Sequence, residues 1–567
     1  MNLTQSQEHA FHLFQNFMSS ESHCFILKGY AGTGKTYLLQ YFIDFLKFSD
    51  CHFTLLAPTG RAANVLRERT TYLANTIHGC IYDLDLKNTT IDNNEEKQQM
   101  DYNLVFDLKE NKSPLNMIYL VDESSMISDK VTEQEYLQFG SGKLLSDLIK
   151  YVNPIQSGRK IVFIGDDAQL PPVNTSHSLA LDVNYLKEHF NLSTNEYQLT
   201  EVYRQSEESG ILTAATDLRE KIGEESFNYY PVKVNKKDLI NLEMQEAIHQ
   251  YVGQWKKSIF ITETNSSTFE YTNYIRELLK LKDLSPGERL LVTKNTHTPS
   301  GDKLFNGDFI QVSDVLSIPE IRTVNFREKD EQITVDLVYR DIEIIYKNLE
   351  NGRAYKEKLK IFENILWRKE VGLTKHERRA MIIDFEKRHK GVKRNSEEFK
   401  KLIINDSYFN AVQVRFGYVI TCHKAQGGEW NTVYADMSYS QSIQCLSYFR
   451  WSYTVLTRAK NLINFVNLPI QAEPASENRF SVLSTILKES LKLYNAEILE
   501  EKESGYENIY YIRMNTNIYR IKIYRNKKDI ITKVMFIDKG ELPPFFNLFE
   551  NVVNRSLYET SNLLTTL

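Results

Sequence analysis

A glycine-rich segment near the start of the chain has the residue types and spacing of a phosphate-binding loop. Residues 29–36 read Gly-Tyr-Ala-Gly-Thr-Gly-Lys-Thr and fit the pattern G-x-x-x-x-G-K-[ST]. Glycines let backbone N–H groups turn inward around phosphates, and the next helix presents its positive N-terminal end to them. We therefore predict a nucleoside triphosphate site, with Lys35 at the β- and γ-phosphates and the Thr36 hydroxyl on Mg²⁺. The other loop residues assigned to this site are Gly29, Ala31, Gly32, Thr33 and Gly34.

Two adjacent acids supply the groups that hydrolysis of a Mg-nucleotide needs. Asp122 and Glu123 directly follow the apolar run 117–121. One carboxylate can hold the ion while the other orients or deprotonates water, and we give Asp122 the first role and Glu123 the second. A surface acidic pair is the alternative. It is weakened because ligands of open α/β sheets bind at the carboxyl ends of strands.

Three further polar side chains could complete the site. Gln169 follows the apolar strand pattern of residues 160–164 and is placed to sense a γ-phosphate. Arg204 could reach across to the nucleotide, although an isolated arginine is more often a surface charge. Gln7 lies three residues after Thr4, which predicts a capping box at the start of a helix. Its amide could equally pair with N6 and N7 of adenine, and both roles stay open.

The elements that must position these groups alternate between strands and helices. An apolar strand pattern at 24–27 precedes the loop and an apolar-periodic segment follows at 37–46. Because Lys35 and Thr36 occur together with these flanks, a glycine turn that only joins a strand to a helix is disfavoured. The strand pattern 52–56 again leads into a helix, so the sheet grows by βα units. Segment 57–63, after this strand, and segment 76–79 further along the chain are rich in small or hydroxyl-bearing residues that suit a phosphodiester backbone, although each alone would be read as a loop.

The length of 567 residues predicts about three to five structural units. The fold class is α/β, with a second α/β region from Ser258 that resumes at Val412 and encloses the strand patterns 306–312 and 333–339 of a small barrel. We predict a first lobe at 1–80 and 115–225, an inserted hairpin at 81–114, a second lobe at 226–305 and 412–470, a small β-barrel with a basic helical insertion at 306–411, and a C-terminal α+β domain at 471–567.

Two regions outside the lobes have distinct patterns. Residues 353–401 read as a charged helical insertion with 16 Lys or Arg against 8 Asp or Glu, although the whole chain has a net charge of −5. Such segregation indicates either contact with nucleic acid or a solvated helical face. In the tail, residues 480–499 have a helical pattern, and three strands are expected between 509 and 536.

Composition is ordinary for a soluble globular protein, at 42% hydrophobic and 25% charged residues. No apolar run approaches the ~20 residues of a membrane span, and no signal-peptide pattern opens the chain, which favours the cytoplasm. The five cysteines never form C-x-x-C, which argues against disulfides and zinc and suggests that most are small core residues.

Read in order, eight segments resemble the motif series of superfamily 1 class B DNA helicases, the group with RecD-type and Dda-type enzymes. They are GYAGTGKT, APTGRAA, TIH, DESSM, GDDAQLPPV, LTEVYRQ, TCHKAQGGEW and YTVLTRAK, and they span residues 1 to about 470. The resemblance implies two RecA-like lobes with ATP and Mg²⁺ between them. The first lobe would carry the hairpin and the second the barrel.

The resemblance also implies residue roles. Arg204 and Arg458 would be arginine fingers, Gln169 would couple nucleotide state to the strand, and Gly428 with Glu429 would lie at the ribose. Gln7 would contact adenine, and Asp122 and Glu123 would keep the roles given above. The residues implied along the single-strand track are Pro58, Thr59, Gly60, Arg61, Thr76, His78, His423, Lys424 and Gln426.

The implied function is an ATP-dependent helicase that moves 5′ to 3′ on single-stranded DNA, opens ss/ds DNA junctions and works in DNA repair or recombination. The hairpin would part the duplex with Tyr102 or Phe106, unless these residues are the core of that subdomain. An RNA helicase of superfamily 1 and an ATP-driven translocase or remodeller that separates no strands remain alternatives. The basic insertion and the tail after residue 470 depart from the compact members of the group.

Overall fold

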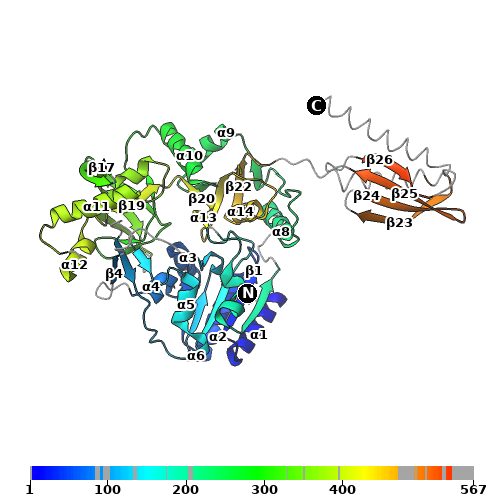
Figure 1. Ribbon diagram of the computed structural model, residues 1–567, viewed down its shortest axis with the longest axis horizontal. Coiled ribbons are helices and arrows are strands. Elements are labelled where there is room, and N and C mark those ends of the chain that lie inside the picture. The colour runs from blue at the N-terminus through cyan, green and yellow to red at the C-terminus, as the bar shows by residue number, and fades with distance from the viewer. Residues whose placement is uncertain are drawn as a thin grey trace. The chain divides into compact units, whose positions relative to one another are not determined.

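The computed structural model describes most of the chain (Figure 1). The described residues are 3–83, 90–93, 102–131, 137–173, 175–201, 209–328, 330–348, 352–393, 396–469, 491, 494–504, 507–525 and 531–538. They divide into two compact units, Met1–Pro469 and Ile470–Leu567. Arg204 lies outside the described residues. Among the helices that are described, none is both long and apolar enough to cross a membrane.

Lobe 1 is built on a six-stranded parallel sheet that confirms the predicted α/β class (Figure 1). The strand order is β3 (Ala74–Thr76), β2 (Phe53–Ala57), β6 (Ile118–Val121), β8 (Lys160–Gly165), β1 (Cys24–Gly29) and β9 (Thr194–Leu199). Along β1 successive side chains enter opposite cores. Phe25 and Leu27 pack in one core, and Cys24 and Ile26 pack in the other.

Helices cover both faces of this sheet. One core takes in α1 (Gln5–Ser19), α2 (Lys35–Phe48) and α3 (Gly60–Thr70), and the other takes in α4 (Ile77–Ile81), α5 (Leu144–Val152) and α7 (Val183–Phe190). The short helices α6 (Pro154–Ser157), η2 (Ser124–Met126) and η3 (Leu179–Leu181) complete the lobe. Because both faces are covered, the carboxyl edge of the sheet is left for the site.

Lobe 2 has a five-stranded parallel sheet. Its order is β10 (Leu239–Asn241), β22 (Ala459–Val466), β21 (Trp430–Asp436), β11 (Ser258–Thr262) and β20 (Val419–Thr421). Its helices are α8 (Gly210–Gly223), α9 (Met244–Gln254), α10 (Asn265–Leu278), α13 (Cys422–Ala425) and α14 (Leu446–Leu456). A single apolar core joins α8 and α14 to this sheet, although α8 lies within the range 115–225 predicted for lobe 1. The same core reaches Ala168 and Leu170 of lobe 1, so the two lobes share buried surface.

The region inserted into lobe 2 is a small barrel whose pairings are antiparallel except for the parallel pair β18–β19. Its strands run β15 (Phe309–Val315), β12 (Arg289–Val292), β19 (Val412–Phe416), β18 (Ala354–Phe362), β17 (Glu331–Lys347) and β16 (Glu320–Glu328), and a β15–β17 pairing closes the ring. The prediction that β12 and β19 belong to lobe 2 is wrong, because both pair inside the barrel. The helical prediction over 353–401 is also wrong at its start, where β18 lies.

Short elements flank the barrel. The hairpin β13 (Thr296–His297) with β14 (Lys303–Leu304) follows β12, and η4 (Glu363–Trp367) follows β18. The helices α11 (Lys375–Arg388) and α12 (Glu397–Asn405) then form the helical part of the insertion.

The segment inserted into lobe 1 forms a three-stranded sheet. β4 (Thr90–Asn93) and β5 (Tyr102–Phe106) pair antiparallel, and β7 (Leu137–Phe139) adds in parallel. At residues 81–83, the described start of the predicted hairpin segment, there is no strand, since α4 ends at Ile81 and Tyr82 makes an isolated bridge with Leu108. Phe106 is 8% exposed and its ring stacks on Phe139 at 5.1 Å, so it is a core residue and no exposed wedge. The side chain of Tyr102 lies outside the described residues.

The second unit is an antiparallel meander of β23 (Ala496–Ser504), β24 (Glu507–Met514), β25 (Asn517–Arg525) and β26 (Ile531–Phe536). The helix predicted at 480–499 is contradicted at its C-terminal end, where β23 begins. All five cysteines are free, as expected. Cys24 and Cys422 are buried in the cores, and Cys51, Cys80 and Cys445 are partly buried and pack against them.

Candidate nucleotide and nucleic-acid sites

The glycine-rich loop lies between β1 and α2 in a conformation suited to phosphate. Gly32 and Gly34 have φ of 84° and 81°, in the left-handed region that glycine tolerates. Gly34 is the N-cap of α2 and provides no side chain to cap the first-turn amides, which leaves their N–H groups for an anion. Lys35 Nζ donates to the carbonyls of Gly29 and Tyr30 at 2.8 and 3.0 Å, so the ammonium is held over the loop. This donor set fits a nucleotide phosphate.

Gln7 ties the first helix to the loop. Its backbone N–H donates to Thr4 Oγ1 at 3.3 Å and its Oε1 accepts from Thr4 N at 3.1 Å, which confirms the predicted capping box. The remaining donor, Nε2, bonds the Thr33 carbonyl at 2.9 Å. The side chain is buried beside the loop. The adenine contact stays a prediction.

The acidic pair lies at the carboxyl end of β6. Glu123 has a φ of 51°, and its N–H donates to Asp122 Oδ1 at 2.9 Å. Burial, and then the charge of Glu123, raises the pKa of Asp122 to about 6, while Lys35 and Arg69 act in the opposite direction. Two cations therefore face this carboxylate. Asp122 and Thr36 offer the oxygen donors that Mg²⁺ prefers.

A tyrosine of lobe 2 bonds directly to the phosphate loop. The Tyr453 hydroxyl, on α14, accepts from Ala31 N at 2.9 Å and donates to Asp166 Oδ2 at 2.6 Å. Burial, and then Asp166, raises the pKa of this phenol well above its usual range, so it stays a neutral donor. Three residues from three separate segments thus meet at one buried point between the lobes.

Arg219 of α8 completes this cluster. Its guanidinium is ion-paired with Asp166, lies 2.5 Å from Asp167 Oδ1, and stacks 4.1 Å from the ring centroid of Tyr30. Sequence analysis missed Tyr453, Asp166 and Arg219. The first two lie inside motifs already singled out for neighbouring residues, whereas Arg219 carried no sequence signal.

The segment after β8 also contacts lobe 2. Leu170 N donates to Thr454 Oγ1 at 3.0 Å, and the Leu170 carbonyl accepts from Gln426 Nε2 at 2.8 Å. The preceding residue, Gln169, is buried, and its Oε1 has no hydrogen-bond partner within the described part of the chain. A buried amide oxygen left unpaired is costly, so a partner is expected to arrive with ligand or conformational change. The position suits the coupling role that we predicted for Gln169.

Arg458 and Glu429 are engaged within the protein. Arg458 is buried and donates to the carbonyls of Thr454 and Gly428, both at 3.1 Å, and to Thr457 Oγ1 at 2.9 Å. Glu429 pairs with Arg69 of lobe 1 at 2.9 Å and with Lys460 at 3.5 Å. In this structure neither side chain points freely at a nucleotide, and their implied roles stay predictions.

Candidate nucleic-acid residues from the two lobes meet at the junction. Arg61 donates to the Lys424 carbonyl at 3.0 Å and stacks 4.7 Å from the Phe309 ring centroid. Lys424 Nζ donates to Asn306 Oδ1 at 2.6 Å. Burial lowers the pKa of Arg61 to about 10, and burial followed by Arg61 lowers that of Lys424 to about 8. Two partly desolvated cations side by side form a site that an anion would stabilise.

The other predicted track residues hold local structure. Thr59 and Thr76 are N-caps that accept from Ala62 N at 3.2 Å and from Gly79 N at 3.1 Å. Pro58, directly before Thr59, is part-exposed between β2 and α3. Gln426 is buried against Leu170, as described above.

The histidines of the predicted track are held neutral. Burial lowers the pKa of His78 to about 4, and its ring packs 5.3 Å from that of Phe139. Burial also lowers the pKa of His423. At neutral pH both therefore act through hydrogen bonding or packing.

Gly60 has a structural reason to be glycine. A Cβ there would lie 2.0 Å from the Phe305 ring, so only glycine admits the close approach of this ring. Phe305 and Asn306, both between β14 and β15, were missed because the strand pattern that begins at Asn306 drew attention to barrel structure alone.

Comparison with known proteins agrees with this arrangement. A model described as an AAA domain matches residues 2–233, and one described as a UvrD-like helicase C-terminal domain matches residues 416–466. An uncharacterised protein of Acanthamoeba polyphaga mimivirus is 24% identical over 489 residues, covering 74% of this chain and 90% of that protein.

The ATP-dependent DNA helicase dda of Enterobacteria phage T4 is 28% identical over 220 residues, which is 38% of this chain and 43% of that protein. The crystal structure of Pif1 helicase from Bacteroides in complex with ADP-AlF3 and ssDNA covers 86% of this chain and 98% of its own, at 15% identity and a TM-score of 0.39. The two family matches lie on lobe 1 and on the end of lobe 2 in the order that the motifs require. The chain thus resembles an AAA domain over residues 2–233 and a UvrD-like helicase C-terminal domain over residues 416–466, and it is similar to a DNA helicase over 220 residues.

Proposed function

We propose that this protein is an ATP-dependent DNA helicase of class B, which moves 5′ to 3′ on single-stranded DNA and opens duplex ahead of it. The observation that carries the proposal is a hydrogen bond between the lobes: Ala31 N, in the phosphate loop of lobe 1, donates to the Tyr453 hydroxyl of lobe 2. A nucleotide bound in that loop meets both lobes, so a change in its phosphates can change their separation. This is the coupling that a motor needs.

For the nucleotide, the residues that would hold it are those of the loop, with Lys35 at the phosphates and Thr36 and Asp122 at Mg²⁺. When bound, the metal ion neutralises the charge that develops on the phosphates during hydrolysis. Glu123 would orient and deprotonate the attacking water. Gln169, whose buried Oε1 has no hydrogen-bond partner among the described residues, would report the reaction to lobe 2.

For the nucleic acid, Arg61 and Lys424 would bind phosphates at the lobe junction. Contacts to phosphate and sugar carry no base information, which suits movement along any sequence. The similarity to dda supports DNA as the strand, and processes of repair or recombination belong to the same proposal.

The test is ATP hydrolysis measured with single-stranded DNA, with RNA of the same sequence and without nucleic acid. DNA should stimulate turnover most, and Lys35→Ala should abolish it because the phosphates lose their charge partner. Greater stimulation by RNA would favour an RNA helicase, and turnover close to wild type in Lys35→Ala would remove the nucleotide assignment.

A further inference from the structure

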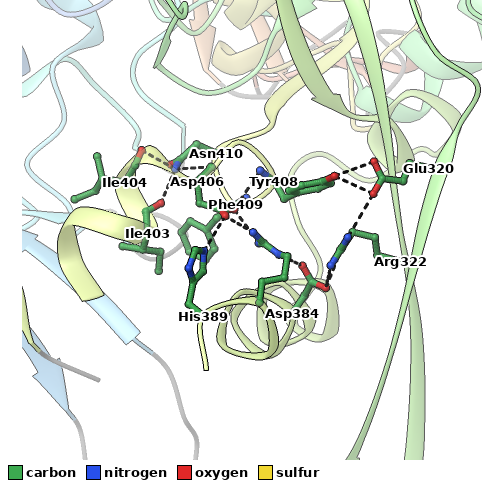
Figure 2. Close-up of polar contacts among 11 residues, drawn as sticks. Glu320, Arg322, Asp384, His389, Ile403, Ile404, Asp406, Tyr408, Phe409 and Asn410 are labelled. Carbon is green, nitrogen blue, oxygen red and sulfur yellow. Dashed lines mark hydrogen bonds and ion pairs between the residues drawn. The ribbon is translucent and has the colours of Figure 1, made fainter. Parts of the chain in front are cut away.

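The helical insertion carries its charges in two layers. In the inner layer, Asp384 of α11 and Asp406 after α12 are buried, with side chains 8% and 6% exposed. Arg388 lies between them and donates to Asp384 Oδ2 at 2.9 Å and to Asp406 Oδ1 at 2.8 Å (Figure 2). Arg322 of β16 donates to Asp384 Oδ1 at 2.9 Å, which fastens the helices to the barrel.

This inner network corrects part of the sequence-based expectation. Arg388 belongs to the basic insertion 353–401, which was expected either to contact nucleic acid or to form a solvated face, but its guanidinium is bonded to two buried carboxylates. Tyr408 and His389 add bonds to Glu320 and Asp406 (Figure 2). Arg388 therefore holds the fold of the insertion, and the acids of the inner layer are neutralised there.

The outer layer is rich in lysine. We name as the lysine edge four exposed residues at the end of α11, after it and on α12: Lys387, Lys390, Lys393 and Lys401. Contacts between described residues give none of the four an ion pair. The exposed acids nearby are Glu397 and Glu398, and Glu397 is paired with Lys400 at 3.2 Å. The buried acids cannot screen the edge, so it presents net positive charge on a rigid support.

The place of the lysine edge indicates what it meets. Figure 1 draws α12 beside β4, in the segment inserted into lobe 1, and Figure 2 draws the helix that carries Ile403 and Ile404 beside blue strands. Residues 353–401 carry eight excess positive charges, which leaves −13 on the rest of a chain whose net charge is −5. A negatively charged surface repels nucleic acid, so cationic side chains are needed wherever the nucleic acid contacts the protein.

We propose that the lysine edge binds backbone phosphates of the duplex arm as it approaches the inserted sheet. This inference rests on the proposed helicase function. Arg61 and Lys424, the candidate contacts to single-stranded DNA, lie at the lobe junction on α3 and α13 and are not part of the lysine edge. The edge is thus a second contact, and we assign it to the duplex because α12 lies beside the inserted sheet and not at the lobe junction.

The experiment replaces all four lysines of the edge by Gln and measures equilibrium binding to forked DNA between 50 and 200 mM salt. Each lost duplex phosphate contact should reduce the slope of log affinity against log salt by about 0.9. Binding to single-stranded DNA, and its stimulation of ATP hydrolysis, should stay at the wild-type level. That second readout shows separately whether the helicase proposal itself holds.

The matched control replaces four exposed lysines of lobe 2 by Gln: Lys256, Lys257, Lys280 and Lys282. It removes the same charge and should leave the slope on forked DNA unchanged. An unchanged slope in the edge variant, an equal loss in the control, or an equal loss on single-stranded DNA would each overturn the proposal. The first of these outcomes would point to a protein partner.

Discussion

Tyr453→Phe tests the contact between the lobes with a single atom removed. The hydroxyl holds the Ala31 N–H at 2.9 Å, and that amide belongs to the loop that must receive phosphates. A nucleotide therefore competes with the tyrosine for this donor. One neutral hydrogen bond contributes about 1 kcal/mol net, so the variant should bind ADP about fivefold more tightly in the absence of DNA.

The fold should survive this substitution. Asp166 keeps its ion pair with Arg219 and its bond from Ala168 N at 3.2 Å, so no buried carboxylate loses all its partners. Stimulation of ATP hydrolysis by DNA should fall, because lobe 2 no longer holds the loop.

Calorimetric titration with ADP measures the affinity, and Tyr448→Phe is the control. Tyr448 lies on the same helix, and its hydroxyl donates to the Met437 carbonyl at 3.3 Å, inside lobe 2. Unchanged or weaker ADP binding in Tyr453→Phe, or equal effects in both variants, would refute the competition.

Three further outcomes are expected. Glu123→Gln should bind ATP and Mg²⁺ yet stop turnover, since Asp122 still holds the metal, and loss of ATP binding would mean that the two roles must be reassigned. Burial lowers the pKa of Lys424 from its ordinary value of 10.5 to about 8, so affinity for single-stranded DNA should fall as pH rises through about 8 and the ammonium loses its proton. Lys424→Arg should flatten that profile, and a flat wild-type profile would exclude Lys424 from the contact. Phe106→Ala should lower the free energy of unfolding by about 3 kcal/mol or less, because the sheet is small. It should impair unwinding and DNA-stimulated hydrolysis together, and a selective loss of unwinding at unchanged stability would restore the wedge role.

Local patterns predicted the phosphate loop and the capping box at Thr4 because each depends on neighbours a few residues away. The strand β18 was missed, since its three lysines and one glutamate lie close together in the sequence and read as part of a charged helix. The sheet to which β12 and β19 belong was also missed, because an apolar strand carries no mark of its partner.

The cluster around Asp166 depends on contacts that no local pattern encodes. Tyr453 is 287 residues away from Asp166 in the chain, and Arg219 reaches both Asp166 and Tyr30 from a helix of the other lobe. The exposure of a basic side chain likewise could not be predicted from the sequence. Lys387 is exposed, whereas its neighbour Arg388 is bonded to two buried carboxylates.

Strand displacement on duplexes with either a 5′ or a 3′ single-stranded overhang tests the central claim most directly. With ATP and Mg²⁺ present, the protein should displace the strand from the 5′-overhang substrate and leave the 3′-overhang substrate paired, and Lys35→Ala should displace neither. Displacement only from the 3′ overhang would contradict the proposed direction. ATP hydrolysis stimulated by DNA with neither substrate opened would show a translocase that separates no strands.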